Sequence, residues 1–199
     1  MTNELLSDDE IITSVLEGCT RNFEILIQRY SGKIIHFINS MTADRDESQS
    51  IAQDVFFKIY QNLPYYKKQD NFSAFIFKIA KNMTLNWLNR QKRTVFFSHL
   101  VGRELDQVSC RQVPALAVDP EQLEKDEKIS QNLRSLPEEQ RIALILKIYL
   151  EFSYKQIREI SGWSIPKIET LISRAKSRLK KNIDLQEKNS GFVLKVRKK

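Results

Sequence analysis

Apolar residues recur every three or four positions along most of this chain, which is the spacing of amphipathic α-helices. Three such stretches in the first half are residues 21–41, 46–62 and 72–93. Ser7 is followed three positions later by Glu10, a capping-box pattern that predicts a further helix directly after Ser7. Pro64 ends the helix over residues 46–62, because the residue before a proline avoids helical backbone angles. We therefore expect a bundle of four helices over residues 7–93.

The apolar period is lost over residues 94–127. This segment contains Gly102 and Pro114, and we interpret it as a flexible linker. Within it, Asp119 followed by Pro120 predicts that a short helix begins, with the acid as its cap and proline at its first position. The chain is thus predicted to fold as two parts on either side of the linker.

The apolar period returns over residues 128–183. The apolar face of its first helix, which follows Leu136-Pro137, is assigned to Ile142, Leu144, Ile145, Leu146 and Ile148. Ser153 with Gln156 is a second capping box and opens a short helix. Residues 162–164, Gly-Trp-Ser, then form a tight turn before a long final helix. Residues 184–199 are polar and basic and are expected to form a mobile tail.

The composition favours helices in both parts. Only 5 glycines and 5 prolines occur among 199 residues, while 41 % of the residues are hydrophobic and 29 % are charged. An all-β fold needs many tight turns, whereas helices with solvated outer faces suit this balance. We predict an all-α fold of two small helical domains. These are an N-terminal helical bundle and a C-terminal helix-turn-helix bundle, joined by the flexible linker.

The sequence lacks the patterns of several other classes of protein. It has no run of about 18 apolar residues, as a membrane-spanning helix requires, and its start has no secretion-signal pattern. We expect a cytoplasmic protein without membrane insertion, in which Cys19 and Cys110 are reduced thiols outside any CxxC pair. His36 and His99 have no partners at metal-ligand spacing, and no Walker loop or nucleophile elbow occurs. We therefore predict no catalytic residue, no metal and no cofactor.

The short helix, glycine-containing turn and longer basic helix of the second part form the helix-turn-helix pattern. The formal net charge of +7 favours a polyanionic partner. The core face of the final helix comprises Ile168, Ile172, Ala175 and Leu179. On the opposite side, Thr170, Ser173 and Arg174 are placed to read base edges, and Arg178 to contact phosphates. The alternative is an amphipathic helix with an ordinary solvated basic face.

The first part combines aromatic and basic side chains. The loop over residues 64–72 contains Tyr65 and Tyr66, and the following helix ends with Arg90 and Arg93. Aromatic rings stack on unpaired bases while cations pair with phosphates, so the combination suits single-stranded nucleic acid. Taken alone, core aromatics beside a solvated loop would give the same pattern. When this aromatic and basic pattern occurs on one chain with a helix-turn-helix, the combination indicates nucleic-acid binding more specifically than either feature by itself.

Three blocks of this sequence resemble one protein family. IAQDVFFKIY and FSAFIFKIAKNMTLNWLNRQKR resemble region 2 of bacterial RNA polymerase sigma factors, and LRSLPEEQRIALILKIYLEFSYKQIREISGWSIPKIETLISRAKSRL resembles region 4. Regions 1 and 3 of the larger sigma factors have no counterpart, as in the extracytoplasmic-function group. The resemblance implies that residues 7–93 form region 2 and residues 128–183 form region 4.

The resemblance also implies partners and residue roles. The implied partners are core RNA polymerase, through its β′ clamp helices and its β flap, promoter DNA, and an anti-sigma factor. The residues implied to bind core polymerase are Gln53, Asp54 and Phe56. Those implied to bind the minus-ten element are Tyr65, Phe72, Lys81, Asn82, Asn86, Arg90 and Arg93. Those implied to bind the minus-thirty-five element are Lys167, Glu169, Thr170, Ser173, Arg174 and Arg178.

The chain departs from the family pattern at several positions. Residues 49–50, Gln-Ser, stand where relatives have an acidic pair, which we expect to weaken or alter the clamp contact. Glu169 and Leu171 stand where relatives have basic residues, so we expect a changed promoter preference, with Glu169 accepting from cytosine N4. The main alternative is a free-standing helix-turn-helix regulator, which would bind duplex DNA without polymerase. It does not account for the blocks around Gln53 and Asn82.

Overall fold

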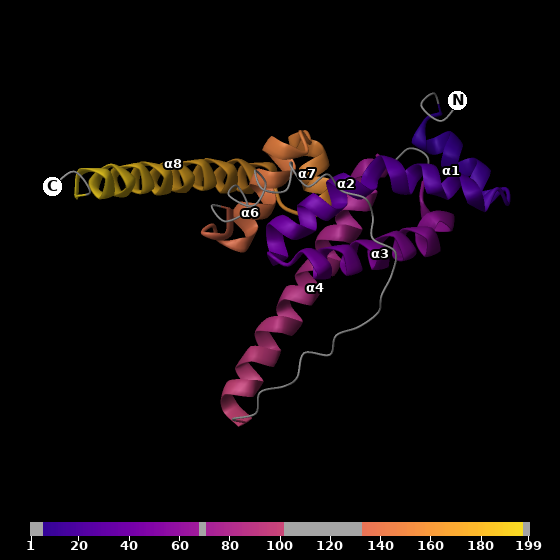
Figure 1. Ribbon diagram of the computed structural model, residues 1–199. Helices are drawn as coiled ribbons and strands as arrows, with labels where there is room; N and C mark the ends of the chain where they lie inside the picture. Colours follow the sequence, from indigo (N-terminus) through magenta and orange to yellow (C-terminus); the bar gives the residue numbers. More distant parts are fainter. Residues whose placement is uncertain (1–5, 68–70, 102–132, 197–199) are drawn as a thin grey trace. The chain divides into compact units, whose positions relative to one another are not determined.

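The computed structural model describes residues 6–67, 71–101 and 133–196 (Figure 1). Within these ranges every regular element is a helix, in agreement with the all-α prediction. No helix in them is both long enough and apolar enough to span a bilayer. The chain divides into two compact units, Met1–Val118 and Asp119–Lys199, and each is described by itself. Most of the expected linker, with Cys110 and the helix start at Asp119, lies outside the described residues.

The described residues of the first unit form four α-helices and two 3₁₀ turns. They are α1 (Asp8–Leu16), η1 (Thr20–Asn22), α2 (Phe23–Thr42), α3 (Arg45–Asn62), η2 (Leu63–Tyr65) and α4 (Phe72–Val101). The prediction of four helices over this part is confirmed. The expected end of the last helix at Arg93 is wrong, since α4 continues to Val101. The helix has no reason to stop earlier, because no glycine or proline occurs between Arg93 and Gly102.

Local hydrogen bonds set the start of α1 and of α4. The Glu10 N–H donates to Ser7 Oγ at 3.3 Å, and the Ser7 N–H donates to the Glu10 carboxylate at 2.7 Å, so the predicted capping box is confirmed. The Ser7 N–H and the Ser7 hydroxyl, which donates at 2.8 Å, both bond to the Glu10 carboxylate and lower its pKa. At α4 the Ala74 N–H donates to the Asn71 side chain at 3.1 Å. Both helices therefore begin at a residue that satisfies an otherwise unpaired backbone donor.

The core of the first unit lies where α4 packs against α2 and α3. Phe37 of α2 and Phe77 of α4 are fully buried and meet edge to face, with ring centroids 5.9 Å apart. Ile34, Ile38 and Ile59 are fully buried as well. Burial of each such side chain contributes about 1.5–3 kcal/mol relative to leaving it in water. This packing determines which side of α4 faces solvent.

After the helical residues 133–134, the described part of the second unit forms three α-helices and one π-helical turn. They are α6 (Glu138–Leu144), the turn η3 (Ile145–Tyr149), α7 (Tyr154–Ser161) and α8 (Ile165–Val196). Most of the apolar face predicted for the first of them is buried, but Ile148 is 54 % exposed, so its assignment to the core is wrong. In η3 the Leu150 N–H donates to the Ile145 carbonyl at 3.0 Å. This hydrogen bond joins residues five apart, whereas those of an α-helix join residues four apart. The end of the helix is therefore rotated relative to a regular α-helix.

The predicted helix-turn-helix is formed by α7 and α8. The Gln156 N–H donates to Ser153 Oγ at 3.2 Å and the Ser153 N–H donates to the Gln156 side chain at 2.8 Å, which confirms the second capping box. At the other end of α7, the Gly162 N–H donates to the Arg158 carbonyl at 2.8 Å. Gly162 has a φ of +78°, a left-handed conformation that favours glycine at a helix end.

The core face of α8 agrees with its predicted spacing. Ile168, Ile172 and Ala175 are buried, Leu179 is half-buried, and α8 packs against both α6 and α7. The helix continues to Val196. Most of the segment that was expected to be a mobile tail is therefore part of α8.

Two glycines offer a stability test with opposite signs. Gly162→Ala places a side chain on left-handed backbone, so we expect the second unit to lose about 1–2 kcal/mol of unfolding free energy. Gly32→Ala replaces a flexible residue inside α2, where an added Cβ meets nothing within 4 Å. We expect it to stabilise the first unit by about 0.5–1 kcal/mol.

Urea unfolding followed by tryptophan fluorescence measures both effects separately. The chain has two tryptophans, Trp87 in the first unit and Trp163 in the second. Gly32→Ala is measured in a Trp163→Phe background and Gly162→Ala in a Trp87→Phe background. Equal signs for the two substitutions would contradict the backbone assignment.

Candidate nucleic-acid interface

The outward face of α8 carries a stripe of polar side chains. The exposed members are Glu169, Thr170, Ser173, Arg174 and Arg178, as their spacing predicts. Leu171 is only 7 % exposed and belongs to the core face. Of the two departures, only Glu169 therefore changes this surface. The stripe lies in the first half of α8, which is the part that reads bases in a helix-turn-helix.

Thr170 has an internal partner that limits what it can offer a base. Its hydroxyl donates to the Pro166 carbonyl at 2.9 Å. A hydroxyl has a single proton, so Thr170 is left only with acceptor capacity. Glu169 beside it is also an acceptor when ionised, and the base-edge donors in the major groove are the amino groups of adenine and cytosine. The pair thus favours these amino groups, while Arg174 supplies donors that fit guanine.

Lys167 is exposed but engaged within the second unit. Its Nζ lies 2.8 Å from Glu139 Oε1 of α6 and 5.1 Å from the centroid of the Trp163 ring. An exposed ion pair of this kind contributes only about 0–1 kcal/mol. A DNA phosphate can therefore compete for Lys167, but Glu139 neutralises part of the charge that Lys167 would bring to it.

The outward face of α4 carries a second polar stripe. The predicted residues that are exposed on one side of this helix are Asn82, Asn86, Arg90 and Arg93. They follow one another at intervals of four, four and three, which places them in a row. Lys78 and Asn89 are exposed in the same row and were not singled out from the sequence. Lys78 is four residues before Asn82 and Asn89 is seven residues after it, and this helical spacing could have predicted that they lie in the same row.

The structure does not bring Lys81 to this stripe. Lys81 is 9 % exposed, and burial lowers its pKa, with a further reduction from the nearby charge of Lys78. Its neighbours in sequence at helical spacing, Phe77 and Thr84, are buried too. Lys81 is thus on the packed side of α4, where its ammonium group is poorly placed to meet a phosphate.

The segment from the end of η2 to the start of α4 has one exposed aromatic side chain, while its other aromatic side chains are buried. Tyr65 is 80 % exposed, whereas Phe72 is 3 % exposed. The Phe72 ring packs edge to face on Tyr30 and on Tyr66, at centroid distances of 5.8 Å and 5.2 Å. Of the two residues predicted to meet a base here, Tyr65 is accessible and Phe72 supports the loop from within.

The residues predicted to dock on core polymerase also differ in exposure. On α3, Asp54 is exposed and Gln53 half-buried, but Phe56 is 5 % exposed and packs in the core. The adjacent Phe57 is 63 % exposed, and Tyr60, one turn on, is 41 % exposed. Sequence reasoning missed Phe57. The signal for it was the apolar face through Val55 and Ile59, which leaves Phe57 pointing away.

The described residues contain no group of three or more His, Cys, Asp or Glu side chains placed to hold a metal ion. The two polar stripes instead present amides, hydroxyls and guanidinium groups, which bind nucleic acid through hydrogen bonds and charge. Groups of these kinds are suited to contacts with base edges and phosphates.

Comparison with protein families gives two matches. The family model of Sigma-70 region 2 matches residues 26–94, and that of Sigma-70 region 4 matches residues 126–179. Together they span more than half of the chain and contain both polar stripes. A free-standing helix-turn-helix regulator would account for the second match but leaves the first unexplained.

Curated relatives match the chain along most of its length. The RNA polymerase sigma factor YlaC of Bacillus subtilis is 29 % identical, over 81 % of this chain and 92 % of its own. The ECF RNA polymerase sigma factor SigW of the same organism is 27 % identical, over 86 % and 94 %. The ECF RNA polymerase sigma-E factor of Escherichia coli is 25 % identical, over 87 % and 93 %.

Solved structures show the same fold. CnrH, solved in complex with the cytosolic domain of CnrY, aligns with a TM-score of 0.67 and 17 % identity over 89 % of this chain and 97 % of its own. The sigma factor RpoE from Bartonella quintana, solved in complex with the anti-sigma factor NepR, aligns with a TM-score of 0.65 and 22 % identity, over 82 % and 98 %.

The Lys167–Glu139 pair leads to a test of the α8 surface. We expect Glu139→Gln to release Lys167 and to raise the affinity for duplex DNA, with a salt dependence steeper by about 0.9 in the logarithmic slope, the value of one added phosphate contact. Fluorescence anisotropy over a salt series measures both. Glu159→Gln removes one exposed acidic charge from α7 and is the matched control. An equal rise in both variants would show a net-charge effect and contradict the pairing.

Proposed function

Because this chain belongs to the sigma-70 family of RNA polymerase sigma factors, in the extracytoplasmic-function group, we propose that its two polar stripes read the two elements of a promoter for core RNA polymerase. The family is regulatory rather than catalytic. The observation that carries the proposal is the pair of stripes itself: α4 and α8 each bury one apolar face and expose a row of polar and basic side chains.

In the second unit, α8 enters the major groove of the minus-thirty-five element. Thr170 and Glu169 accept from base amino groups, and Arg174 donates to guanine. Ser173 lies in the same row and can bond either base type, while Arg178 is further along the helix and contacts phosphate. Lys167 joins them once a phosphate displaces Glu139.

In the first unit, the α4 stripe holds the opened strand of the minus-ten element. Unstacking a base costs a few kcal/mol, so the captured base needs new partners. Stacking on an aromatic ring contributes about 1–3 kcal/mol per base, and the exposed Tyr65 ring is available for it. Asn82 and Asn86 offer amide groups for hydrogen bonds to the base and sugar, and Arg90 and Arg93 hold the phosphates.

Docking on core polymerase uses the outward face of α3. Asp54 supplies an exposed charge and Phe57 an exposed ring, and aromatic side chains are enriched in protein interfaces. We place Phe57, rather than the buried Phe56, at the β′ clamp helices, with Gln53 at the edge of the contact. The β flap then contacts the second unit, and polymerase performs all phosphoryl transfer.

An anti-sigma factor is a further proposed partner in a cytoplasmic setting. The neighbour RpoE was solved with one, and this chain exposes apolar side chains that such a partner would cover. They are Phe57 and Tyr60 on α3, and Ile148 and Tyr149 in η3. A protein bound to Phe57 would also block the proposed clamp contact, which would keep the chain inactive.

Two substitutions in the first unit separate strand capture from docking. We expect Asn82→Ala to leave affinity for core polymerase unchanged and to lower the fraction of open complex about tenfold, because base capture loses hydrogen bonds of roughly 1.4 kcal/mol in total. We expect Phe57→Ala to weaken core binding about tenfold, since it removes a large exposed anchor.

Core binding is measured by titration of a fluorescently labelled chain, and opening by permanganate footprinting at saturating protein. Gln28→Ala, an exposed residue of α2 outside both proposed surfaces, is the control for each assay. Loss of core binding in Asn82→Ala, or full core binding in Phe57→Ala, would refute the assignment of these two faces.

A further inference from the structure

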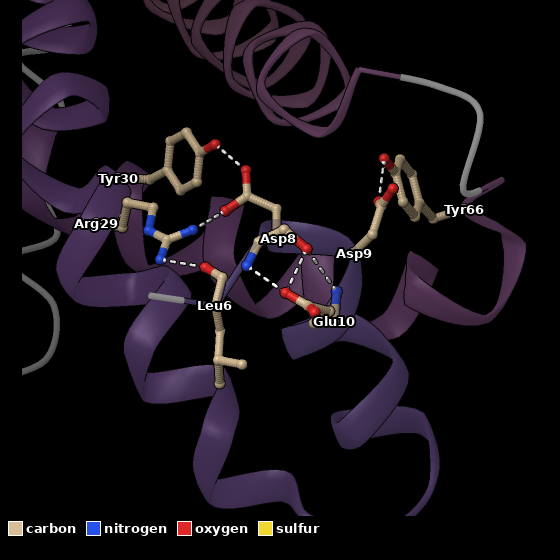
Figure 2. A network of polar contacts seen from close by, with 8 residues as sticks. Leu6, Asp8, Asp9, Glu10, Arg29, Tyr30 and Tyr66 are labelled. Atoms are coloured by element: carbon tan, nitrogen blue, oxygen red, sulfur yellow. Dashed lines mark hydrogen bonds and ion pairs between the residues drawn. The ribbon is translucent and has the colours of Figure 1, made fainter. Parts of the chain in front are cut away.

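The first turn of α1 is hydrogen-bonded to Tyr66, the residue that follows Tyr65 in the sequence (Figure 2). The Tyr66 hydroxyl donates to Asp9 Oδ1 at 3.0 Å, across 57 positions of the sequence. Tyr66 as a whole is 9 % exposed, and the carboxylate acceptor makes this a charge-assisted hydrogen bond. Asp9 is therefore a distant residue that holds one particular residue of the loop.

A neighbouring carboxylate fixes α1 itself. Asp8 accepts hydrogen bonds from the Arg29 guanidinium and the Tyr30 hydroxyl, both of α2, and Arg29 also donates to the Leu6 carbonyl at 2.9 Å (Figure 2). Burial and the Asp8 carboxylate raise the pKa of Tyr30, which keeps its hydroxyl protonated as a donor. Since Asp8 anchors α1 to α2, Asp9 is a fixed point rather than a mobile one.

Aromatic packing completes the anchoring of Tyr66. Its ring centroid lies 5.2 Å from that of Phe72 and 5.4 Å from that of Phe75, at the start of α4. The Tyr66 N–H donates to the carbonyl of Leu63, which is 1 % exposed. Tyr65 thus lies between Leu63, two residues before it, and Tyr66, which are both buried, yet its own ring is 80 % exposed. The backbone that carries this ring is held while the ring remains accessible.

We propose that Asp9 is a positioning residue for base capture, which acts through Tyr66 to hold the Tyr65 ring in the orientation that an unpaired base needs. The inference rests on the role proposed above for Tyr65. A ring already held in its bound orientation loses less conformational freedom on binding, so more of the stacking energy appears as affinity. Releasing Tyr66 would leave the ring present but less well placed.

The test uses the complex of the full chain with core RNA polymerase on fork-junction promoter DNA whose minus-ten strand is unpaired. Affinity is measured for the preferred base and for an abasic site at the captured position, and their ratio reports base capture. Tyr66→Phe removes the hydroxyl and keeps the ring, and Asp9→Ala removes its acceptor. We expect each to lower the ratio about fivefold, the factor that corresponds to one hydrogen bond, and the double variant to lower it no further.

Asp46→Ala is the matched control, because it removes an exposed acid from the first turn of α3. It should leave the ratio unchanged. If Asp9→Ala and Tyr66→Phe behave like this control, or weaken binding equally to both DNAs as a general loss of structure would, the inference is overturned.

Tyr65→Ala separates failure of the inference from failure of the proposed function. In that background Tyr66→Phe should have no further effect, because no ring remains to be positioned. If Tyr65→Ala itself leaves the ratio unchanged, the role of Tyr65 is refuted and the inference with it. If Tyr65→Ala lowers the ratio but Tyr66→Phe lowers it just as much again in that background, Tyr66 acts independently and the inference alone is refuted.

Discussion

Burial of one face of α4 against α2 and α3 is the interaction on which the first unit depends. A helix turns by about 100° per residue, so once Phe77 is packed edge to face on Phe37, the direction of every other side chain on α4 is set. Asn82 and Asn86 face solvent for that reason, while Lys81 is drawn inside. In the second unit, burial of Ile168 and its companions on α8 acts in the same way. Each proposed recognition surface is thus the solvent-facing side of a helix whose other side is packed in a core.

Internal partners then determine what each surface residue can offer. The Thr170 hydroxyl donates to the Pro166 carbonyl and can therefore only accept from a base, while Lys167 is ion-paired with Glu139. In the first unit, the Tyr66 hydroxyl donates to Asp9, while the adjacent Tyr65 is exposed. A residue's position on a helical wheel therefore gives its direction, but its intramolecular bonds decide its chemistry.

The sequence was sufficient where the determining interaction is local. Capping boxes at Ser7 and Ser153 lie within four residues, and both were predicted correctly. Where the outcome depends on distant partners, prediction failed or stayed open. Phe72 is buried because Tyr30, far away in the chain, packs on it. Ile148 is exposed because a π-helical turn changes the direction in which its side chain points. No pattern in the sequence predicted that turn.

The central claim is that this chain gives promoter specificity to core RNA polymerase through two separate DNA-reading faces. Run-off transcription on a library of genomic promoter fragments, with core polymerase alone and with the full chain added, tests it most directly. We expect transcripts that depend on the chain, from a small set of fragments that share two spaced sequence elements. No transcript from any fragment, together with tight binding of duplex DNA by the chain alone, would contradict the claim.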